Sequence, residues 1–453
     1  MRAAHTVEQV RAAEAVAMAA LPDGALMQRA AAGLAAAIAD YLGGCYGARI
    51  LLLVGPGDNG GDALYAGGML ARRGAQVEAF LLRDSRYLSD FLVAGGRVVE
   101  RPDRRPDLIV DGVTGIGGRP GLDARVAALL AEHADVPVVA VDVPSGVGVD
   151  SGETPESHVR ADLTVTFGTH KPCHLVDPAA LACGVVHLVD LDLDLPQAPV
   201  SALTAADVAA LVPWPDPAGH KYTRGVLGVW TGSPRYPGAA VLSVAGAASG
   251  LCGMVRYAGP VADVVRARHP EVVSGAGRVQ AWVIGSGSAE DAGAAWAQAR
   301  SDGVPVLVDA DALGVIDGSS GPLVLTPHAG ELAALLDVTR AEVEAAPLRF
   351  ARLAAERYDA VVLLKGRRSI TAKPDGEVRV TTSGVPWLGV AGSGDVLGGV
   401  IGALLAAGLT PFDATSAGSW LHGAAAAWAS QGGPITASRL AEAVPAVVRS
   451  LNR

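Results

Sequence analysis

The sequence has few cysteines and aromatic residues and no cluster of positive charge, and each shortage argues against a class of protein. Cys45, Cys173, Cys183 and Cys252 are scattered over 453 residues without a C-x-x-C pair, which argues against a zinc site and a disulfide framework. We expect small buried thiols in a reducing compartment. Lysine and arginine, 36 residues against 46 acidic ones, form no basic run, so a nucleic-acid-binding surface is not expected.

The sequence also lacks the pattern of a signal peptide and that of a membrane span. The N-terminus, MRAAHTVEQVRAAEAV, carries Glu8, Arg11 and Glu14 where a signal peptide needs an apolar run. The most apolar stretches, 239–255 and 396–409, consist largely of Ala, Gly and Ser and are short for a bilayer. We interpret them as buried helices and expect a cytoplasmic protein.

What the chain does have is a repeated alternation of strand and helix patterns, typical of an α/β protein. After a helical stretch over the first forty residues, apolar runs predict strands at 48–55, 76–82, 107–112, 136–143, 161–167 and 184–191. After a proline-rich stretch at 193–225, a second series predicts strands at 226–232, 279–285, 304–310, 322–327 and 360–366. Three helices are expected to close the chain. Continuous apolar runs indicate parallel sheets covered on both faces. The chain is too long for one ordinary core, so we predict two α/β domains, 1–200 and 201–453, the first a Rossmann-like doubly wound sheet.

The first candidate site is a glycine-rich loop, GPGDNGGDALYAGG (55–68), between a predicted strand and a helix that runs through Arg72. Its glycines fit the dinucleotide-binding pattern G-x-G-x-x-G. Asp58, Asn59 and Asp62 crowd the turn, however, and a pyrophosphate over a helix N-terminus is disfavoured by two carboxylates. These oxygens suit a cation or ribose hydroxyls better. A tight turn without a ligand is the alternative.

Polar groups also follow three later strands, in VDGVTGIGGRPG (110–121), VDVPSGVGVD (141–150) and TFGTHKPCH (166–174). The carboxyl ends of strands in a doubly wound sheet face one crevice. Asn59, Asp111 and Ser145 are therefore expected to converge on one ion. The stretch from Gly115 to Gly121 is a candidate backbone cradle for phosphate, and Asp142 is placed to meet a ligand's hydroxyl or ring.

The combination of GPGDNGGDA, VDGVTGIGGRPG and VDVPSG resembles the NAD(P)H-hydrate epimerase family. The resemblance implies that the domain interconverts the R and S epimers of NADH or NADPH that carries water on its nicotinamide ring. It implies potassium on Asn59, Asp111 and Ser145. It implies these substrate contacts: Asp58, Asn59, Gly60, Gly61, Asp62, Gly115, Ile116, Gly117, Gly118, Arg119, Pro120, Gly121 and Asp142. We hypothesise that Asp142 is the acid/base. Asp58 and Cys173 depart from the family's usual Asn and Gly.

The second domain lacks G-x-x-x-x-G-K-[ST] and is therefore no P-loop enzyme. It has GVAGSGDVLGGVIG (389–402), where a glycine turn runs into an apolar helix. Backbone amides of Gly392, Ser393 and Gly394 are placed to stabilise a phosphate at the helix start. Asp395 beside them is a candidate base for a substrate hydroxyl. An ordinary helix start with a favourable aspartate is the alternative.

The set HK-x-x-x-G, TPH-x-GE, KG-x-x-[ST] and G-x-GD resembles the dehydratase branch of the ribokinase-like superfamily, the ADP-dependent NAD(P)H-hydrate dehydratases. The resemblance implies a ribokinase-like fold and removal of water from the S epimer, driven by ADP with Mg²⁺. It implies hydrate contacts at Ala239, Gly287, His328 and Asp395, and nucleotide contacts at Lys365, Gly366, Arg367, Arg368, Ser369 and Gly394. The chain departs from the common pattern at Tyr222 (Gly), at IGSGS (IGPG) and at Ser369 (Thr).

The two resemblances together imply a bifunctional metabolite-repair enzyme, in which the epimerase supplies the dehydratase with the epimer that it accepts. The alternatives are a ribokinase-like small-molecule kinase with an N-terminal ligand-binding domain, and a non-enzymatic binding module. The expected partners are the small molecules NAD(P)H hydrate and ADP, without nucleic acid or membrane. Because relatives of this kind commonly associate, a homo-oligomer is expected.

Overall fold

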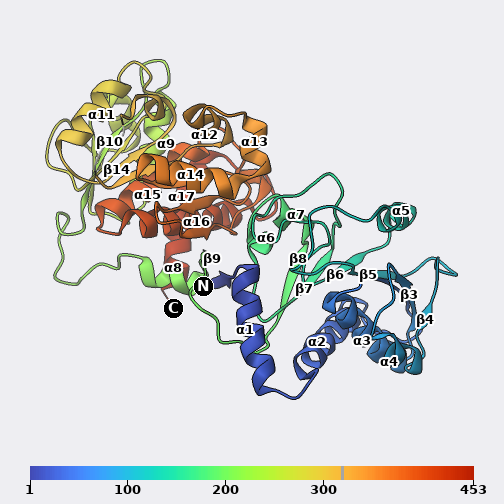
Figure 1. Cartoon of the computed structure of the whole chain (residues 1–453). Coiled ribbons are helices and arrows are strands. Elements are labelled where there is room, and N and C mark those ends of the chain that lie inside the picture. Colours follow the sequence, from blue (N-terminus) through green and yellow to red (C-terminus); the bar gives the residue numbers. More distant parts are fainter. Residues whose placement is uncertain (318–320, 453) are drawn as a thin grey trace. The chain divides into compact units, whose positions relative to one another are not determined.

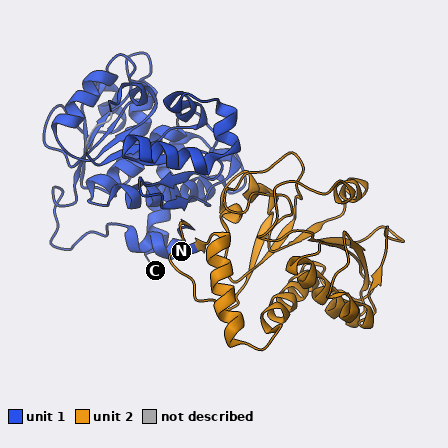
Figure 2. Ribbon diagram, in the orientation of Figure 1, with its two compact units in different colours: residues 1–2, 201–453 blue, residues 3–200 orange. Residues whose placement is uncertain are grey.

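The computed structural model describes residues 1–317 and 321–452. It divides into two compact units, an N-terminal unit (Ala3–Val200) and a C-terminal unit (Met1–Arg2 with Ser201–Arg453), coloured separately in Figure 2. Both are α/β units (Figure 1), which confirms the predicted fold class. No helix among the described residues has the length and apolar character needed to span a bilayer.

The N-terminal unit contains a seven-stranded sheet of order β4-β3-β2-β5-β6-β7-β8, in which every pair is parallel. Its strands are β2 (Arg49–Val54), β3 (Gln76–Leu81), β4 (Arg97–Val98), β5 (Leu108–Gly112), β6 (Val138–Val141), β7 (Leu163–Phe167) and β8 (Val185–Val189). Its helices are α1 (Val7–Ala20), α2 (Ala25–Tyr41), α3 (Asp58–Arg72), α4 (Leu88–Val93), α5 (Ala124–Glu132), α6 (Pro172–Leu175) and α7 (Ala179–Ala182).

The side chains of β2 alternate between two cores, as the pleat of a strand requires. Ile50, Leu52 and Val54 pack with α2 and α3, whereas Leu51 and Leu53 pack with α5. The sheet is thus covered on both faces, as its continuous apolar runs predicted.

The C-terminal unit is built on an eleven-stranded sheet of order β1-β9-β18-β17-β16-β15-β14-β13-β10-β11-β12. The strands are β1 (Arg2–Ala4), β9 (Val200–Ala202), β10 (Val226–Trp230), β11 (Met254–Tyr257), β12 (Val273–Ser274), β13 (Ala281–Ile284), β14 (Val306–Val308), β15 (Leu323–Leu325), β16 (Val361–Leu364), β17 (Ile370–Ala372) and β18 (Val378–Val380). The strands from β10 to β16 are parallel, and β16-β17-β18 form antiparallel pairs.

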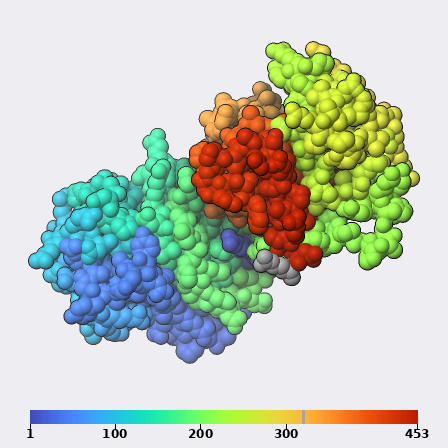
Figure 3. Space-filling view, turned by 180° about the vertical axis from the view of Figure 1, so that it is seen from behind, coloured from blue at the N-terminus to red at the C-terminus, as the bar shows by residue number. Residues whose placement is uncertain are grey.

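The helices of this unit cover the sheet and supply the larger core. They are α8 (Ala205–Leu211), α9 (Pro237–Ala247), α10 (Ala262–Arg268), α11 (Ala292–Ser301), α12 (Ala329–Leu336), α13 (Arg340–Ala345), α14 (Pro347–Tyr358), α15 (Ser393–Ala406), α16 (Pro411–Ser430) and α17 (Ala437–Leu451), with short 3₁₀ turns η1 (Ala310–Val315) and η2 (Pro386–Leu388). Residues of α9, α15, α16 and α17 share one apolar cluster with β10 and β13. The closing helices, in red, also reach the surface of this unit (Figure 3).

Each predicted strand is present and is one or more residues shorter than its apolar run. The two apolar stretches considered for the membrane belong to the buried helices α9 and α15 and their flanks. The prediction that the first forty residues are helical was wrong in detail. It contains the short strand β1 and a break at 21–24 between α1 and α2. The hairpin of β17 and β18 was not predicted, because these short strands lie among polar and charged residues and form no continuous apolar run.

Candidate active sites

The first candidate site lies where the strand order of the N-terminal sheet reverses. The chain leaves β2 toward β3 and β4, then returns to β5 on the other side of β2 and continues to β8. In open α/β sheets such a switch point forms the crevice that binds ligands. The glycine loop after β2 and Asp111 of β5 both lie at this point, as the sequence predicted.

Two glycines allow the loop after β2 to pass close to its neighbours. A Cβ on Gly55 would lie 1.8 Å from the Val113 carbonyl oxygen, and one on Gly60 would lie 2.2 Å from the Gly55 oxygen. Neither position has room for a side chain, so both glycines are required by the packing of β2, α3 and the segment after β5. This close approach brings Asn59 against the second loop, where a Cβ on Gly115 would lie 3.0 Å from Asn59 Oδ1.

Asn59, Asp111 and Ser145 form a buried group of oxygen-bearing side chains beside this loop. The Ser145 hydroxyl donates to Asp111 Oδ1 at 2.6 Å, and the Ser145 amide donates to Asp111 Oδ2 at 2.7 Å. Burial raises the pKa of Asp111 to about 6, although its bonds to Ser145 oppose the shift. The amide nitrogen of Asn59 is buried and has no hydrogen-bond partner. A cation would offset both the buried carboxylate and the unmatched amide, whose oxygen and nitrogen are interchangeable in assignment.

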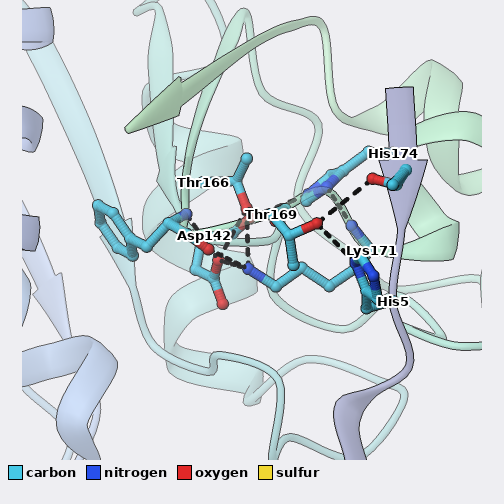
Figure 4. Close-up of polar contacts among 8 residues, drawn as sticks. His5, Asp142, Thr166, Thr169, Lys171 and His174 are labelled. Atoms are coloured by element: carbon cyan, nitrogen blue, oxygen red, sulfur yellow. Dashed lines mark hydrogen bonds and ion pairs between the residues drawn. The ribbon is translucent and has the colours of Figure 1, made fainter. Parts of the chain in front are cut away.

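Asp142 lies directly after β6 and is held by a buried lysine (Figure 4). Lys171 Nζ lies 2.5 Å from Asp142 Oδ1, and the Thr166 hydroxyl donates to the same oxygen at 2.9 Å. Lys171 is 1% exposed and also donates to Thr166 Oγ1 and to the Phe167 carbonyl, each at 3.0 Å. All three protons of the ammonium group are thus used. Within the described residues, the hydrogen bonds of the Asp142 side chain all reach Oδ1, which leaves Oδ2 for a ligand.

Two further carboxylates, Asp58 and Asp62, lie near the start of α3. Burial, and then the charges of Asp142, Asp58 and Glu14, raise the pKa of Asp62 well above its usual value, and Asp62 Oδ1 is buried without a partner. Asp58 is exposed and is paired with Arg86 at 2.8 Å and with the Tyr87 hydroxyl at 2.7 Å. Arg86 therefore offsets the negative charge that distinguishes this chain from the epimerase pattern.

The loop that carries Lys171 is tied to the N-terminal segment and to α6 (Figure 4). His5 Nδ1 lies 2.8 Å from the Thr169 hydroxyl, and the His5 amide donates to the His170 carbonyl. His174 Nδ1 accepts from the Lys171 amide at 3.0 Å, and its Nε2 lies 3.0 Å from the Asp142 carbonyl. These contacts fix both ends of the Lys171–Asp142 pair.

The second candidate site lies at the carboxyl ends of β13 to β16 in the C-terminal unit. Asp309 follows β14, His328 follows β15 after two residues, and Lys365 follows β16. Because these strands are parallel, the three residues emerge at one edge of the sheet. The helix α15 starts beside them, since a Cβ on Gly394 would lie 3.7 Å from Lys365 Nζ.

Asp395 occupies the first turn of α15 and receives a hydrogen bond from the Ser286 hydroxyl. Burial raises the pKa of Asp395 to about 6, against the opposing effect of that hydrogen bond. Ser286 is followed by Gly287, whose φ of +62° favours glycine. A Cβ on Gly287 would lie 2.9 Å from the Ala239 side chain. The structure therefore brings Ala239, Gly287 and Asp395 together.

Lys365 joins the other side chains of this site. Its Nζ lies 2.7 Å from Asp309 Oδ1 and 3.8 Å from Glu331 Oε2. Burial lowers the pKa of Lys365, but these two carboxylates outweigh it and raise the pKa overall. His328 is exposed and caps α12: its Nδ1 accepts from the Glu331 amide at 3.0 Å, and Glu331 accepts from the His328 amide at 2.7 Å. Its Nε2 lies 3.5 Å from Glu331 Oε1.

The segment after Lys365 is an exposed turn that leads into β17. The Ser369 hydroxyl and the Gly366 backbone bond each other at 3.3 Å. Arg367 and Arg368 lie in the same turn. The predicted nucleotide-binding residues Lys365–Ser369 and Gly394 therefore lie in one region, because Lys365 begins the turn and its Nζ lies beside Gly394.

Comparisons with known proteins agree with this arrangement. The family described as NAD(P)H-hydrate dehydratase matches residues 227–446, and the YjeF-related protein N-terminus matches residues 23–173. The "Bifunctional NAD(P)H-hydrate repair enzyme Nnr" of Mycobacterium tuberculosis is 46% identical over 441 residues, 92% of each chain. The protein of the same name from Mycobacterium leprae is 46% identical over 454 residues, 94% of each chain.

The chain belongs to the bifunctional NAD(P)H-hydrate repair enzymes. The solved ADP/ATP-dependent NAD(P)H-hydrate dehydratase of Bacillus subtilis, co-crystallised with ATP and Mg²⁺, is similar to it with a TM-score of 0.53 and 27% identity. That likeness covers 56% of this chain and 99% of the other.

Several residues of this repair enzyme were missed by sequence reasoning, chiefly Thr166, Lys171, Ser286, Asp309 and Glu331. Asp309 and Glu331 stand in quoted motifs, LVDADAL and TPHAGE, directly after strands, so their position could have indicated a role. Lys171 also stands in a quoted stretch, TFGTHKPCH, after a strand, but its partner Asp142 lies 29 residues away in the sequence, so the pairing gave no local signal.

The structure shows the surroundings of the residues that depart from the family pattern. Ser286 takes the place of the common Pro and bonds Asp395. Cys173 is fully buried in an apolar cluster with Val143 and Val149. Tyr222 is 59% exposed, and Lys221 lies 5.1 Å from its ring centre. All four cysteines are buried, and none forms a disulfide within the described residues.

Proposed function

We propose that the chain repairs hydrated NADH and NADPH, epimerising the R and S hydrates in its N-terminal domain (1–200) and dehydrating the S hydrate in its C-terminal domain (201–453). One observation carries the proposal: each unit fixes one carboxylate, Asp142 or Asp395, among the residues of its family motifs. A non-enzymatic module has no need of a lysine buried to bind a carboxylate, because such burial is costly.

In the epimerase domain, Asp142 acts as the acid/base at the hydrated ring. Lys171 and Thr166 hold its Oδ1, so that Oδ2 meets the substrate in one orientation. The backbone of Gly115–Gly121 receives the phosphates. Asn59, Asp111 and Ser145 would hold a potassium ion, whose charge would favour the anionic substrate beside the acidic residues of α3.

In the dehydratase domain, Asp395 accepts the proton of the ring hydroxyl while the terminal phosphoryl group of ADP is transferred to the hydroxyl oxygen. The carbon–oxygen bond of the phosphorylated hydroxyl then breaks, phosphate leaves with the electron pair, and the neighbouring ring carbon loses a proton. NAD(P)H, AMP and phosphate result. Lys365 and the amides at the start of α15 stabilise the phosphoryl charge. Asp309 and Glu331 offer the carboxylate oxygens that Mg²⁺ prefers, and Mg²⁺ would neutralise charge on the nucleotide.

The experiment is a repair assay on a mixture of both NADH-hydrate epimers with ADP, Mg²⁺ and K⁺, following the near-ultraviolet absorbance of restored dihydronicotinamide. Wild type should restore the whole mixture rapidly. Asp142→Asn should restore only the S fraction rapidly, with the rest limited by spontaneous epimerisation. Asp395→Asn should restore nothing above background, a loss of at least 100-fold.

The same assay separates the alternatives. A phosphorylated product that accumulates without restored absorbance would favour a small-molecule kinase. Unchanged recovery of the R fraction in Asp142→Asn would refute the role of Asp142. Replacing ADP by ATP, and NADH hydrate by NADPH hydrate, assigns the preferred substrates.

A further inference from the structure

The N-terminal segment before residue 23 lies outside the range that the family match covers, and it contains helix α1. Thr6 and Gln9 form a capping box that fixes the start of α1. Val7, Arg11 and Glu14 follow at helical spacing and therefore share one face. Val7 packs against the same apolar cluster as Ile116 of the glycine-rich loop, so this face of α1 is turned toward that loop.

Arg11 lies directly over the loop. A Cβ built on Gly117 would lie 2.5 Å from Arg11 Nη2, and no other atom lies near enough to crowd it. Arg11 is exposed and forms no hydrogen bond or ion pair with the residues that the structure describes. A guanidinium group thus stands unpaired over a loop without side chains at the point of contact.

The loop itself offers unused donors. Gly118 donates to the Gly115 carbonyl at 2.9 Å, which closes a turn, while the amides of Ile116 and Gly117 bond no acceptor within residues 1–317 and 321–452. Backbone N–H groups of this kind form anion-binding concavities. An arginine beside them adds a planar, permanently charged donor that suits phosphate.

The same helix face continues to the reacting end of the site. The pKa of Glu14 is raised by burial first and then by the charge of Asp142, whereas Lys171 and Arg11 lower it. Glu14 is therefore close to the Asp142–Lys171 pair while Arg11, one turn earlier, is over the loop. This face of α1 extends along the site from its ring end to its phosphate end.

We propose that Arg11 binds the diphosphate of the NAD(P)H hydrate, so that α1 forms a wall of the epimerase site. This inference rests on the proposed epimerase function. The diphosphate lies between the Arg11 guanidinium and the amides of the Gly115–Gly121 loop, and the nicotinamide ring then points toward Asp142. Arg11 contributes to binding and leaves the proton transfer at Asp142 unchanged.

The test measures epimer exchange in the full-length protein without ADP or ATP, so that the dehydratase domain is inactive. Arg11→Met should raise KM for NADH hydrate about tenfold or more while kcat stays within twofold, since one charge-assisted phosphate contact is lost. The inhibition constant of ADP-ribose, which has the diphosphate but no nicotinamide ring, should rise by a similar factor. Arg11→Lys should fall between the two proteins. Arg29→Met, an exposed arginine on α2, is the matched control and should behave as wild type.

An unchanged KM and ADP-ribose inhibition constant in Arg11→Met, or a fall in kcat with KM unchanged, would overturn the inference while leaving the epimerase function in place. Wild type without any epimer exchange would instead refute the epimerase function, and the inference with it. Equal melting temperatures of Arg11→Met, Arg29→Met and wild type show that folding is not the cause.

Discussion

The two central carboxylates are held by different kinds of partner. Asp142 has a cationic partner, with Lys171 Nζ at 2.5 Å in a buried setting. Asp395 has a neutral partner, the Ser286 hydroxyl, while Lys365 acts only at longer range. Burial then dominates at Asp395 and raises its pKa to about 6. This value lies below neutral pH, so a base with this pKa would be mostly ionised near pH 7 and would keep more basicity than an ordinary aspartate.

The raised pKa of Asp395 therefore predicts that the dehydratase rate falls on the acid side of its pH profile, which we call the acid limb. The base must be ionised, so the rate of dehydration should fall as the pH drops through about 6. The hydrogen bond from Ser286 favours the ionised form and lowers the pKa. Ser286→Ala should therefore move the acid limb to higher pH. Ser288→Ala, which removes only a bond to the Gly285 carbonyl in the same loop, should leave the limb in place. The measurement is kcat for the S hydrate from pH 5 to 8. A limb that does not move in Ser286→Ala would contradict the prediction.

At the scale of elements, the start of α15 is positioned by close contact between two glycine-containing helices. A Cβ on Gly246 of α9 would lie 2.2 Å from the Val396 carbonyl oxygen, and one on Gly399 of α15 would lie 2.1 Å from the Ser243 oxygen. The backbones of α9 and α15 thus touch on both sides of the contact. Since Ala239 on α9 and Asp395 on α15 belong to one site, this packing also sets the site's width.

The contact between α9 and α15 predicts that alanine substitutions at two adjacent glycines have different effects on stability. Gly399→Ala would push α15 away from α9 and should destabilise the protein by about 1–3 kcal/mol. In Gly398→Ala the new methyl group would meet only side chains at 3.6 and 3.7 Å, so its stability should stay equal to wild type or rise. Thermal unfolding of both variants checks this. Equal melting temperatures would mean that the helices can separate without cost.

The elements that the sequence predicted are those with long patterns. Strands such as β2 and β5 lie in continuous apolar runs and were found, whereas β17 and β18 are flanked by polar and charged residues and lie in no such run. In the site, Asp142 and Asp395 were predicted because each stands inside a local motif. The partners of Lys171 and Arg11 could not be predicted, because each residue meets its neighbours only after the chain has folded. Local patterns predict which residues stand at strand ends, while distant partners depend on the packing of whole elements.

At the scale of the molecule, each candidate site is built from one compact unit. The residues around Asp142 lie within Ala3–Val200, and those around Asp395 lie within Ser201–Arg453. Under the proposed function, the hydrate leaves the first site and reaches the second through solution.

This independence predicts complementation between two inactive chains. Asp142→Asn keeps a working dehydratase, and Asp395→Asn keeps a working epimerase. Removing the Asp142 charge leaves Lys171 buried without its partner, which can destabilise the N-terminal unit. The recovery rate of the S fraction therefore serves as an internal check that the C-terminal unit of that variant is folded.

When the two variants are mixed, each at the concentration used for wild type, working epimerase sites and working dehydratase sites are each present at their wild-type concentration. The epimer mixture should then be restored at the wild-type rate, although Asp142→Asn alone leaves the R fraction to spontaneous epimerisation. The absorbance assay with ADP, Mg²⁺ and K⁺ measures both phases. A mixture that restores the R fraction much more slowly than wild type would show that repair needs both working sites in one chain, and that the hydrate does not pass between them through free solution.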